Sequence, residues 1–114
     1  MGDLSEHFSR WEFADHRTGK VLVDERLVVV LERLRAICGR PLRIVSGYRS
    51  PATNRAAGGA VKSQHLDGRA ADIPAGYATV QQAKDAGFTG VGYCAGWAVH
   101  VDVRPSALVV FPDC

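Results

Sequence analysis

The fold and chemistry of this chain are set by the stretch Ser63-Gln64-His65-Leu66-Asp67-Gly68-Arg69-Ala70-Ala71-Asp72-Ile73, in which one of four histidines precedes an aspartate by seven positions. A second stretch, Val99-His100-Val101-Asp102-Val103-Arg104, carries another histidine in a strand-like alternation with valine. Two histidines and one carboxylate form a ligand set of catalytic zinc sites, which leave the fourth position to water. We therefore interpret the sequence as a small zinc hydrolase.

Asp72 interrupts a short apolar strand predicted over residues 69–73. A carboxylate is rarely tolerated in such a strand unless it is paired or bound to a metal. Gly68 allows the chain to turn, so that His65 can fold back beside Asp72. The competing interpretation is a structural aspartate in an ion pair with Arg49 or Arg69. Metal ligation explains both stretches together, and we favour it.

The second stretch is predicted to be a strand with two distinct faces, because side chains alternate along a strand. One face is apolar and belongs to the core: Val99, Val101 and Val103. The other is polar: Ala98, His100, Asp102 and Arg104. Taken alone, this strand could equally be an exposed sheet face with an ordinary alternation of charges.

Composition bounds the possible functions. The chain has 114 residues, enough for one domain over 1–114, with 46% hydrophobic and 23% charged residues. Its net charge of +2 is too small to indicate a nucleic-acid partner. Its apolar runs are too short to cross a membrane, and its first residues lack the pattern of a secretion signal. We expect neither feature in this sequence.

The three cysteines, Cys38, Cys94 and Cys114, cannot all pair and have no Cys-x-x-Cys spacing, which excludes a cysteine-rich zinc site. Cys38 ends an apolar helix and is expected to be a buried thiol. Cys94 could act as a nucleophile with His100, but nothing around it supplies the positive charge that lowers a thiol pKa. We rank that interpretation far behind a metal site.

Helical periodicity and turn residues predict the remaining elements. We expect helices from Asp24 to about Ile37, from residue 50 to 58 and from 79 to 86. We expect strands over 42–46 and 69–73, a hairpin of 90–94 with 98–104, and an edge strand over 108–111. This order indicates an α+β fold with a mostly antiparallel sheet and flanking helices.

The motifs, taken together, resemble those of the zinc D-alanyl-D-alanine carboxypeptidases, a family that includes VanY-like carboxypeptidases and murein endopeptidases and has the hedgehog/DD-peptidase fold. The resemblance covers about residues 4–104 and rests on Ser46-Gly47-Tyr48-Arg49-Ser50-Pro51, Ser63-x-His65-x-x-Gly68-x-Ala70-x-Asp72 and Val99-His100-Val101-Asp102. It implies zinc bound by His65, Asp72 and His100, and a peptidoglycan stem peptide as substrate.

The resemblance also implies roles around the metal. Arg49 is similar to the family arginine that polarises the scissile carbonyl or stabilises its oxyanion. Ser63 would hydrogen-bond the substrate, and Tyr48 and Gln64 are candidate contacts at the rim, although packing is the favoured role of Tyr48.

The proton acceptor is where the sequence departs from the family pattern. Many members carry Glu or Asp three positions before the last zinc histidine, and this chain has Trp97 there. Asp102 shares the predicted face of His100 and is our first choice, either as proton acceptor or as a carboxylate that orients a zinc ligand. An ion pair of Asp102 with Arg104 or Arg69 is the structural alternative, and Asp67 is a second candidate acceptor.

These inferences predict a monomeric zinc peptidase that acts at the cell wall, whether periplasmic, extracellular or released by a phage. The type of peptidase, carboxypeptidase or endopeptidase, and the choice between D,D and L,D bonds stay open. The alternative from another class is a catalytically weak zinc-bound domain that binds cell-wall peptide or a protein partner.

Overall fold

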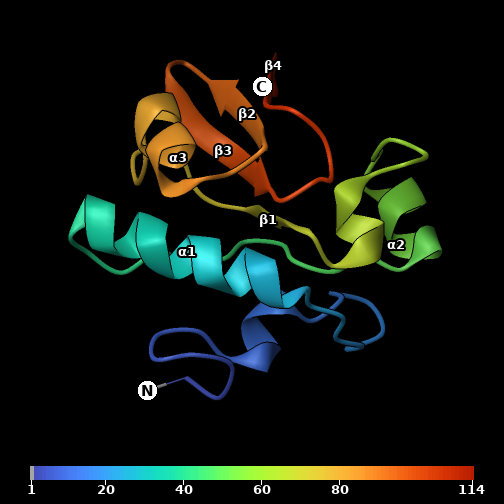
Figure 1. Ribbon diagram of the computed structural model, residues 1–114. Helices are drawn as coiled ribbons and strands as arrows, with labels where there is room; N and C mark the ends of the chain where they lie inside the picture. The colour runs from blue at the N-terminus through green and yellow to red at the C-terminus, as the bar shows by residue number, and fades with distance from the viewer. Residues whose placement is uncertain (1) are drawn as a thin grey trace.

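The computed structural model describes residues 2–114 (Figure 1). The elements follow the chain as η1 (Arg10–Phe13), α1 (Glu25–Cys38), α2 (Pro51–Ala56), η2 (Gln64–Asp67), β1 (Ala70–Asp72), α3 (Val80–Ala86), β2 (Gly90–Cys94), β3 (Trp97–Asp102) and β4 (Val109–Pro112). Over residues 2–114, no helix has the length and apolar character needed to span a bilayer.

Four strands form one sheet in the order β1-β3-β2-β4. Strand β3 pairs antiparallel with both β1 and β2, and β4 pairs parallel with β2 at the edge. The predicted α+β class, the mostly antiparallel sheet and the C-terminal edge strand are therefore confirmed.

The core lies between one face of this sheet and two helices. Ala71 of β1, Val91 of β2 and Val101 of β3 are fully buried there, as are Leu31 and Leu34 of α1. Helices α1 and α3 pack against each other over this face, whereas α2 and η2 lie together beyond one end of β1 (Figure 1). Helices α1 and α3 thus cover the face of the sheet opposite to the one from which Asp72 and His100 project.

Helix α1 lies within one residue of its predicted bounds because its end signals act as expected. The Asp24 side chain accepts a hydrogen bond from Arg26 N, and Gly39 closes the helix in the left-handed conformation at φ 70°.

The predicted strand over residues 42–46 is wrong. Only Ser46 forms a bridge, to Asp72, through the bonds Val45 N to Asp72 O and Asp72 N to Ser46 O. Strand β1 is three residues long, so only one residue of the segment 42–46 pairs with it. The contact still matters, because it fixes the backbone of Asp72 from the side opposite β3.

The predicted alternation along β3 fails at one residue. Gly92 pairs with His100 while Tyr93 pairs with Ala98, so Val99 is an extra residue in a bulge. Ala98 therefore faces the core, and Val99 is half-buried and lines a cavity on the other side. Val101 and Val103 lie in the core as predicted.

A buried carboxylate, Asp15, holds the segment that leads into the site. Its oxygens accept hydrogen bonds from the backbone of Arg17, Thr18 and Ser50 and from the hydroxyls of Thr18 and Thr53. Burial acts to raise the pKa of Asp15, but these hydrogen bonds outweigh it and hold the pKa well below its usual range. The ionised form of Asp15 is therefore part of the folded structure.

We expect Asp15→Asn to lower the free energy of unfolding at pH 7 by about 1–3 kcal/mol, because an amide nitrogen cannot accept these bonds. The pKa of Asp15 is lower in the folded than in the unfolded chain. Its stabilising contribution is therefore present above the unfolded value, about 3.9, and is lost as the pH falls below it.

Urea denaturation between pH 7 and pH 3 should accordingly show a smaller acid-induced loss of stability in Asp15→Asn than in the wild type. The matched control is Asp85→Asn, an exposed position on α3. Equal acid dependence in Asp15→Asn and the wild type would contradict the assignment.

Candidate metal centre

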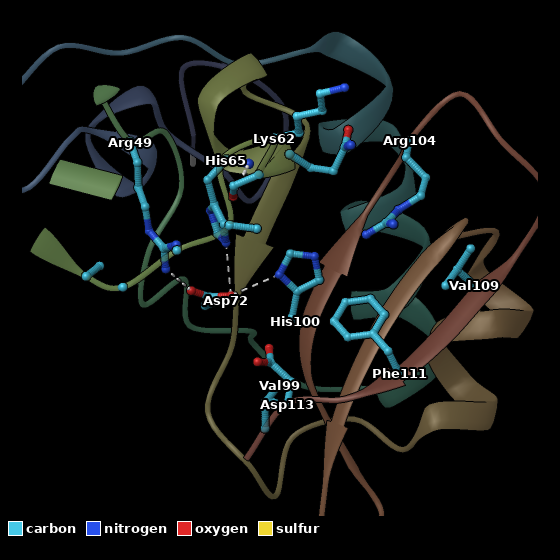
Figure 2. Close-up of a pocket in the computed structure, with 16 residues that line it drawn as sticks. Arg49, Lys62, His65, Asp72, Val99, His100, Arg104, Val109, Phe111 and Asp113 are labelled. Atoms are coloured by element: carbon cyan, nitrogen blue, oxygen red, sulfur yellow. Dashed lines mark hydrogen bonds and ion pairs between the residues drawn. The ribbon is translucent and has the colours of Figure 1, made fainter. Parts of the chain in front are cut away.

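Three predicted ligands meet at one point of the structure. His65 lies on η2, Asp72 ends β1, and His100 lies directly opposite Asp72 on β3. One ligand atom from each of the three lies within 4.8 Å of the others, and Figure 2 shows the two rings turned toward the Asp72 carboxylate. Two of the three come from neighbouring strands in register, and the third comes from the turn just before β1.

His65 is buried, with 2% of its surface exposed, and the Nδ1 side of its ring is fixed by the backbone. The Ser63 hydroxyl accepts from His65 N and caps η2, and Nδ1 lies 2.7 Å from Gly47 O. Because a carbonyl oxygen only accepts, Nδ1 carries the hydrogen. Nε2 is then left as the lone-pair nitrogen, 3.1 Å from Asp72 Oδ1.

His100 is held in the same manner by a carboxylate. Its Nε2 lies 2.7 Å from Asp102 Oδ2 and its Nδ1 lies 3.3 Å from Asp72 Oδ1. Burial acts to lower the pKa of His100, but hydrogen bonds to Asp102 and Asp72 outweigh it and raise the pKa to about 9. The site therefore favours positive charge at this ring.

Asp102 is completely buried behind His100. Arg104 donates to it from Nε at 2.9 Å and from Nη2 at 2.6 Å. Burial acts to raise the pKa of Asp102, and the hydrogen bonds from Arg104 and His100 overcome this and lower it. Both carboxylate oxygens are thus engaged, and Asp102 does not itself line the cavity, so the position does not support Asp102 as proton acceptor. The position of Asp102 fits instead the role of a carboxylate that orients the His100 ring, and Asp102 also forms an ion pair with Arg104.

Two glycines of β2 make room for this arrangement. A side-chain carbon on Gly90 would lie 2.1 Å from Asp102 Oδ1, and one on Gly92 would lie 2.9 Å from the Cβ of His100. Neither distance is sterically possible. The absence of side chains at these two positions is therefore what allows a buried polar layer within the sheet.

Asp72 has a second partner besides the histidines. Arg49 Nη2 donates to Asp72 Oδ2 at 2.8 Å, while Asp72 Oδ1 faces the two rings. Burial acts to raise the pKa of Asp72, and its contacts with the His100 and His65 rings lower the pKa well below its usual range. The ion pair with Arg49 and the metal-ligand arrangement are therefore compatible, one on each oxygen.

The donor set fits a zinc ion. Two imidazole nitrogens and one carboxylate oxygen converge, and the second nitrogen of each ring is bound to a carbonyl or a carboxylate. Zinc histidines show this pattern because the outer hydrogen bond fixes the tautomer and the ring orientation.

A cavity of about 680 Å³ opens over the cluster, and it contains most of the other predicted site residues. Arg49, Ser63 and Gln64 line it, and Gln64 Oε1 is buried without a hydrogen-bond partner in the described chain. Tyr48 is buried and lies outside this lining, which does not support a substrate contact and agrees with its favoured packing role. Asp67 also lies outside the lining and faces Arg69 Nη1 at 3.6 Å.

The C-terminal segment supplies site residues that sequence reasoning missed. Phe111 and Asp113 line the cavity, and the Phe111 ring lies 5.4 Å from the His100 ring. Cys94 and Cys114 form a disulfide, which rules out Cys94 as a nucleophile. The two cysteines were the sequence signal for this position of the C-terminal segment, because their pairing brings residues 109–114 beside β2.

Cys38, the free thiol, is half-buried at the end of α1, and burial raises the pKa of this thiol.

Comparison with known proteins agrees with this geometry. Residues 6–102 match the model of the family described as Peptidase M15. The chain belongs to this family. Relatives include the peptidoglycan L,D-endopeptidase MepK of Escherichia coli strain K12 and that of Shigella flexneri. Each is 34% identical over an alignment 107 positions long, and the match covers 82% of this chain and 59% of the relative.

The M15 assignment confirms the predicted family resemblance, and the α+β fold is compatible with it. The chain spans less than two thirds of the length of these curated relatives. The matched residues 6–102 contain the whole histidine–aspartate cluster and Asp102, and they end before β4.

We expect Asp102→Asn to weaken zinc binding about 10–100-fold, the usual cost of losing a partner that orients a metal ligand. Asn keeps the shape but loses the charge that engages both His100 and Arg104. Competition with a chromophoric chelator measures the zinc affinity, and Asp85→Asn serves as control. Unchanged zinc affinity in a folded Asp102→Asn protein would contradict an orienting role.

Proposed function

We propose that this chain is a zinc-dependent endopeptidase that hydrolyses peptide bonds of peptidoglycan. The observation that carries the proposal is the convergence of His65, Asp72 and His100 beneath a cavity in a chain of the M15 family. The similarity to peptidoglycan L,D-endopeptidases supports both the substrate and the endopeptidase type. The cavity volume is within the range of small-ligand and peptide subsites.

His65, Asp72 and His100 would hold the zinc ion. When bound, zinc would lower the pKa of a coordinated water and polarise a carbonyl. Arg49 would donate a hydrogen bond to the oxygen on which negative charge develops, since its guanidinium lines the cavity beside Asp72. Ser63 and Gln64 would bind the peptide backbone, and the buried Gln64 Oε1 is an acceptor suited to a peptide N–H.

The proposed place of action is the cell wall, with the chain acting as a single domain and a monomer. All residues of the candidate site come from one chain. The Cys94–Cys114 disulfide supports a location outside the reducing cytosol, because such bonds persist mainly in oxidising compartments.

A second candidate function is a zinc-bound domain that binds cell-wall peptide without efficient hydrolysis. Trp97 favours it, because this residue stands where many similar peptidases carry a carboxylate. Incubation with purified peptidoglycan separates the two functions, since only hydrolysis yields new peptide termini.

Incubation of the zinc-loaded protein with purified peptidoglycan should release cleaved stem peptides, and a chelator should abolish the release. His65→Ala and His100→Ala should bind zinc substoichiometrically and be inactive, because each loses one of three ligands. Mass spectrometry of the products identifies the bond cut, and elemental analysis gives the zinc content. Peptide binding without cleavage would support the second function, and full zinc occupancy in both variants would contradict the ligand set.

We expect Arg49→Ala to lower turnover about 10²–10³-fold, the scale of a lost oxyanion donor. Because Arg49 also pairs with Asp72, zinc affinity should fall too, and turnover must be measured at saturating zinc. Arg49→Lys should recover little, because an ammonium lacks the planar fork that serves two partners. The exposed Arg55→Ala on α2 is the matched control. Wild-type turnover in Arg49→Ala would show that the guanidinium has no role in the reaction.

A further inference from the structure

The end of the chain is fixed beside the metal centre by three separate contacts. Strand β4 pairs with β2 from Val109 to Pro112, Asp113 N donates to Tyr93 O at 2.8 Å, and Cys114 is joined to Cys94. Asp113 therefore lies between an edge strand and a disulfide, with its backbone held on both sides. Its position is defined by the fold although it is the second-last residue of the sequence.

The side chain of Asp113 lies on the same face of the sheet as His100. Gly92 of β2 is the common neighbour, because it pairs with His100 on one side and with Phe111 on the other. A carbon added to Gly92 would lie 2.9 Å from the Cβ of His100 and 3.0 Å from the Cβ of Asp113. Figure 2 shows the Asp113 carboxylate pointing toward Asp72 and His100.

Of the carboxylates that line this cavity in the described chain, Asp113 is the one without a hydrogen-bond or ion-pair partner. Within the described chain, the acidic residues that line the cavity are Asp72 and Asp113. Asp72 faces two histidines and Arg49, and Asp102 lies outside the lining with both oxygens bound. Over residues 2–114, the Asp113 side chain makes no hydrogen bond and no ion pair within 4.0 Å, and it is exposed to solvent.

Trp97 begins β3 at the turn of the β2–β3 hairpin and does not line the cavity, so this end of β3 brings no carboxylate to it. The cavity nevertheless needs a group that accepts a proton if a water molecule is to attack a peptide carbonyl. Asp113 approaches from the neighbouring edge of the sheet, beyond the residues 6–102 that match the family.

We propose that Asp113 is the proton acceptor of this site, an inference that rests on the proposed peptidase function. As the oxygen of water bonds to the carbonyl carbon, its proton passes to a carboxylate oxygen of Asp113. The same proton then passes to the leaving nitrogen as the C–N bond breaks. Water supplies the new carboxyl oxygen, so the step consumes no other reactant.

The test compares Asp113→Asn and Asp113→Glu with the wild type in three measurements. These are hydrolysis of soluble cross-linked muropeptides, zinc affinity by chelator competition, and muropeptide affinity by calorimetry. Asp113→Asn should lower kcat about 10²–10⁴-fold, the usual contribution of a positioned acid or base. Its zinc and muropeptide affinities should stay within twofold of the wild type. Asp113→Glu should recover part of the turnover, and Asp85→Asn should behave as the wild type does.

Other outcomes overturn the proposal in distinguishable ways. A loss of zinc affinity in Asp113→Asn would make Asp113 a metal ligand, and weaker muropeptide binding with unchanged kcat would make it a substrate contact. Wild-type kcat in Asp113→Asn would leave the proposed peptidase function standing and remove Asp113 from the reaction. A wild-type protein that cleaves no peptidoglycan would instead overturn the proposed function itself.

Discussion

The carboxylate of Asp72 is the group on which the rest of the site depends. Its Oδ1 faces His65 and His100, its Oδ2 binds Arg49, and its backbone bonds to the segment at Val45 and Ser46. One residue thus joins η2, β3 and the loop before α2. Asp72 is half-buried, and a carboxylate withdrawn from water needs such partners, so these segments stabilise its ionised form when they come together.

A polar layer inside a small sheet requires space as well as partners. The layer runs from Asp72 through His100 and Asp102 to Arg104, and it crosses β1 and β3 in register. The adjacent strand accommodates it only because Gly90 and Gly92 carry no side chains. The polar layer needs both partners and space, since a larger residue on β2 would displace either Asp102 or His100.

The parts of the fold that the sequence predicts well are those decided by local signals. Asp24 and Gly39 delimit α1, Ser50 and Pro51 begin α2, and the hairpin of β2 and β3 follows its turn residues. The three candidate ligands could be predicted because His65 and Asp72 lie on either side of the turn at Gly68, and His100 lies in an alternating strand. These signals need no knowledge of distant contacts.

The failures concern pairings between distant segments. The bulge at Val99 arises from the register between β2 and β3, and the single bridge at Ser46 arises from the shortness of β1. Asp102 was placed on the correct strand, but its burial depends on Arg104 turning back over it. Asp113 lies just past the predicted edge strand, and its place beside His100 depends on the parallel pairing of β4 with β2, which local sequence signals do not specify.

The electrostatics of the site explain why a histidine between two carboxylates belongs in a metal centre. Asp72 and Asp102 flank His100, and the pKa of its ring rises to about 9 because both hydrogen bonds favour the charged form. The same field favours a metal cation at Nδ1 in place of the proton, with Nε2–H still donating to Asp102. Arg104 balances the charge of Asp102 from the far side. The charge of a metal ion held by His65, Asp72 and His100 would thus be compensated mainly by Asp72, the carboxylate among these three side chains.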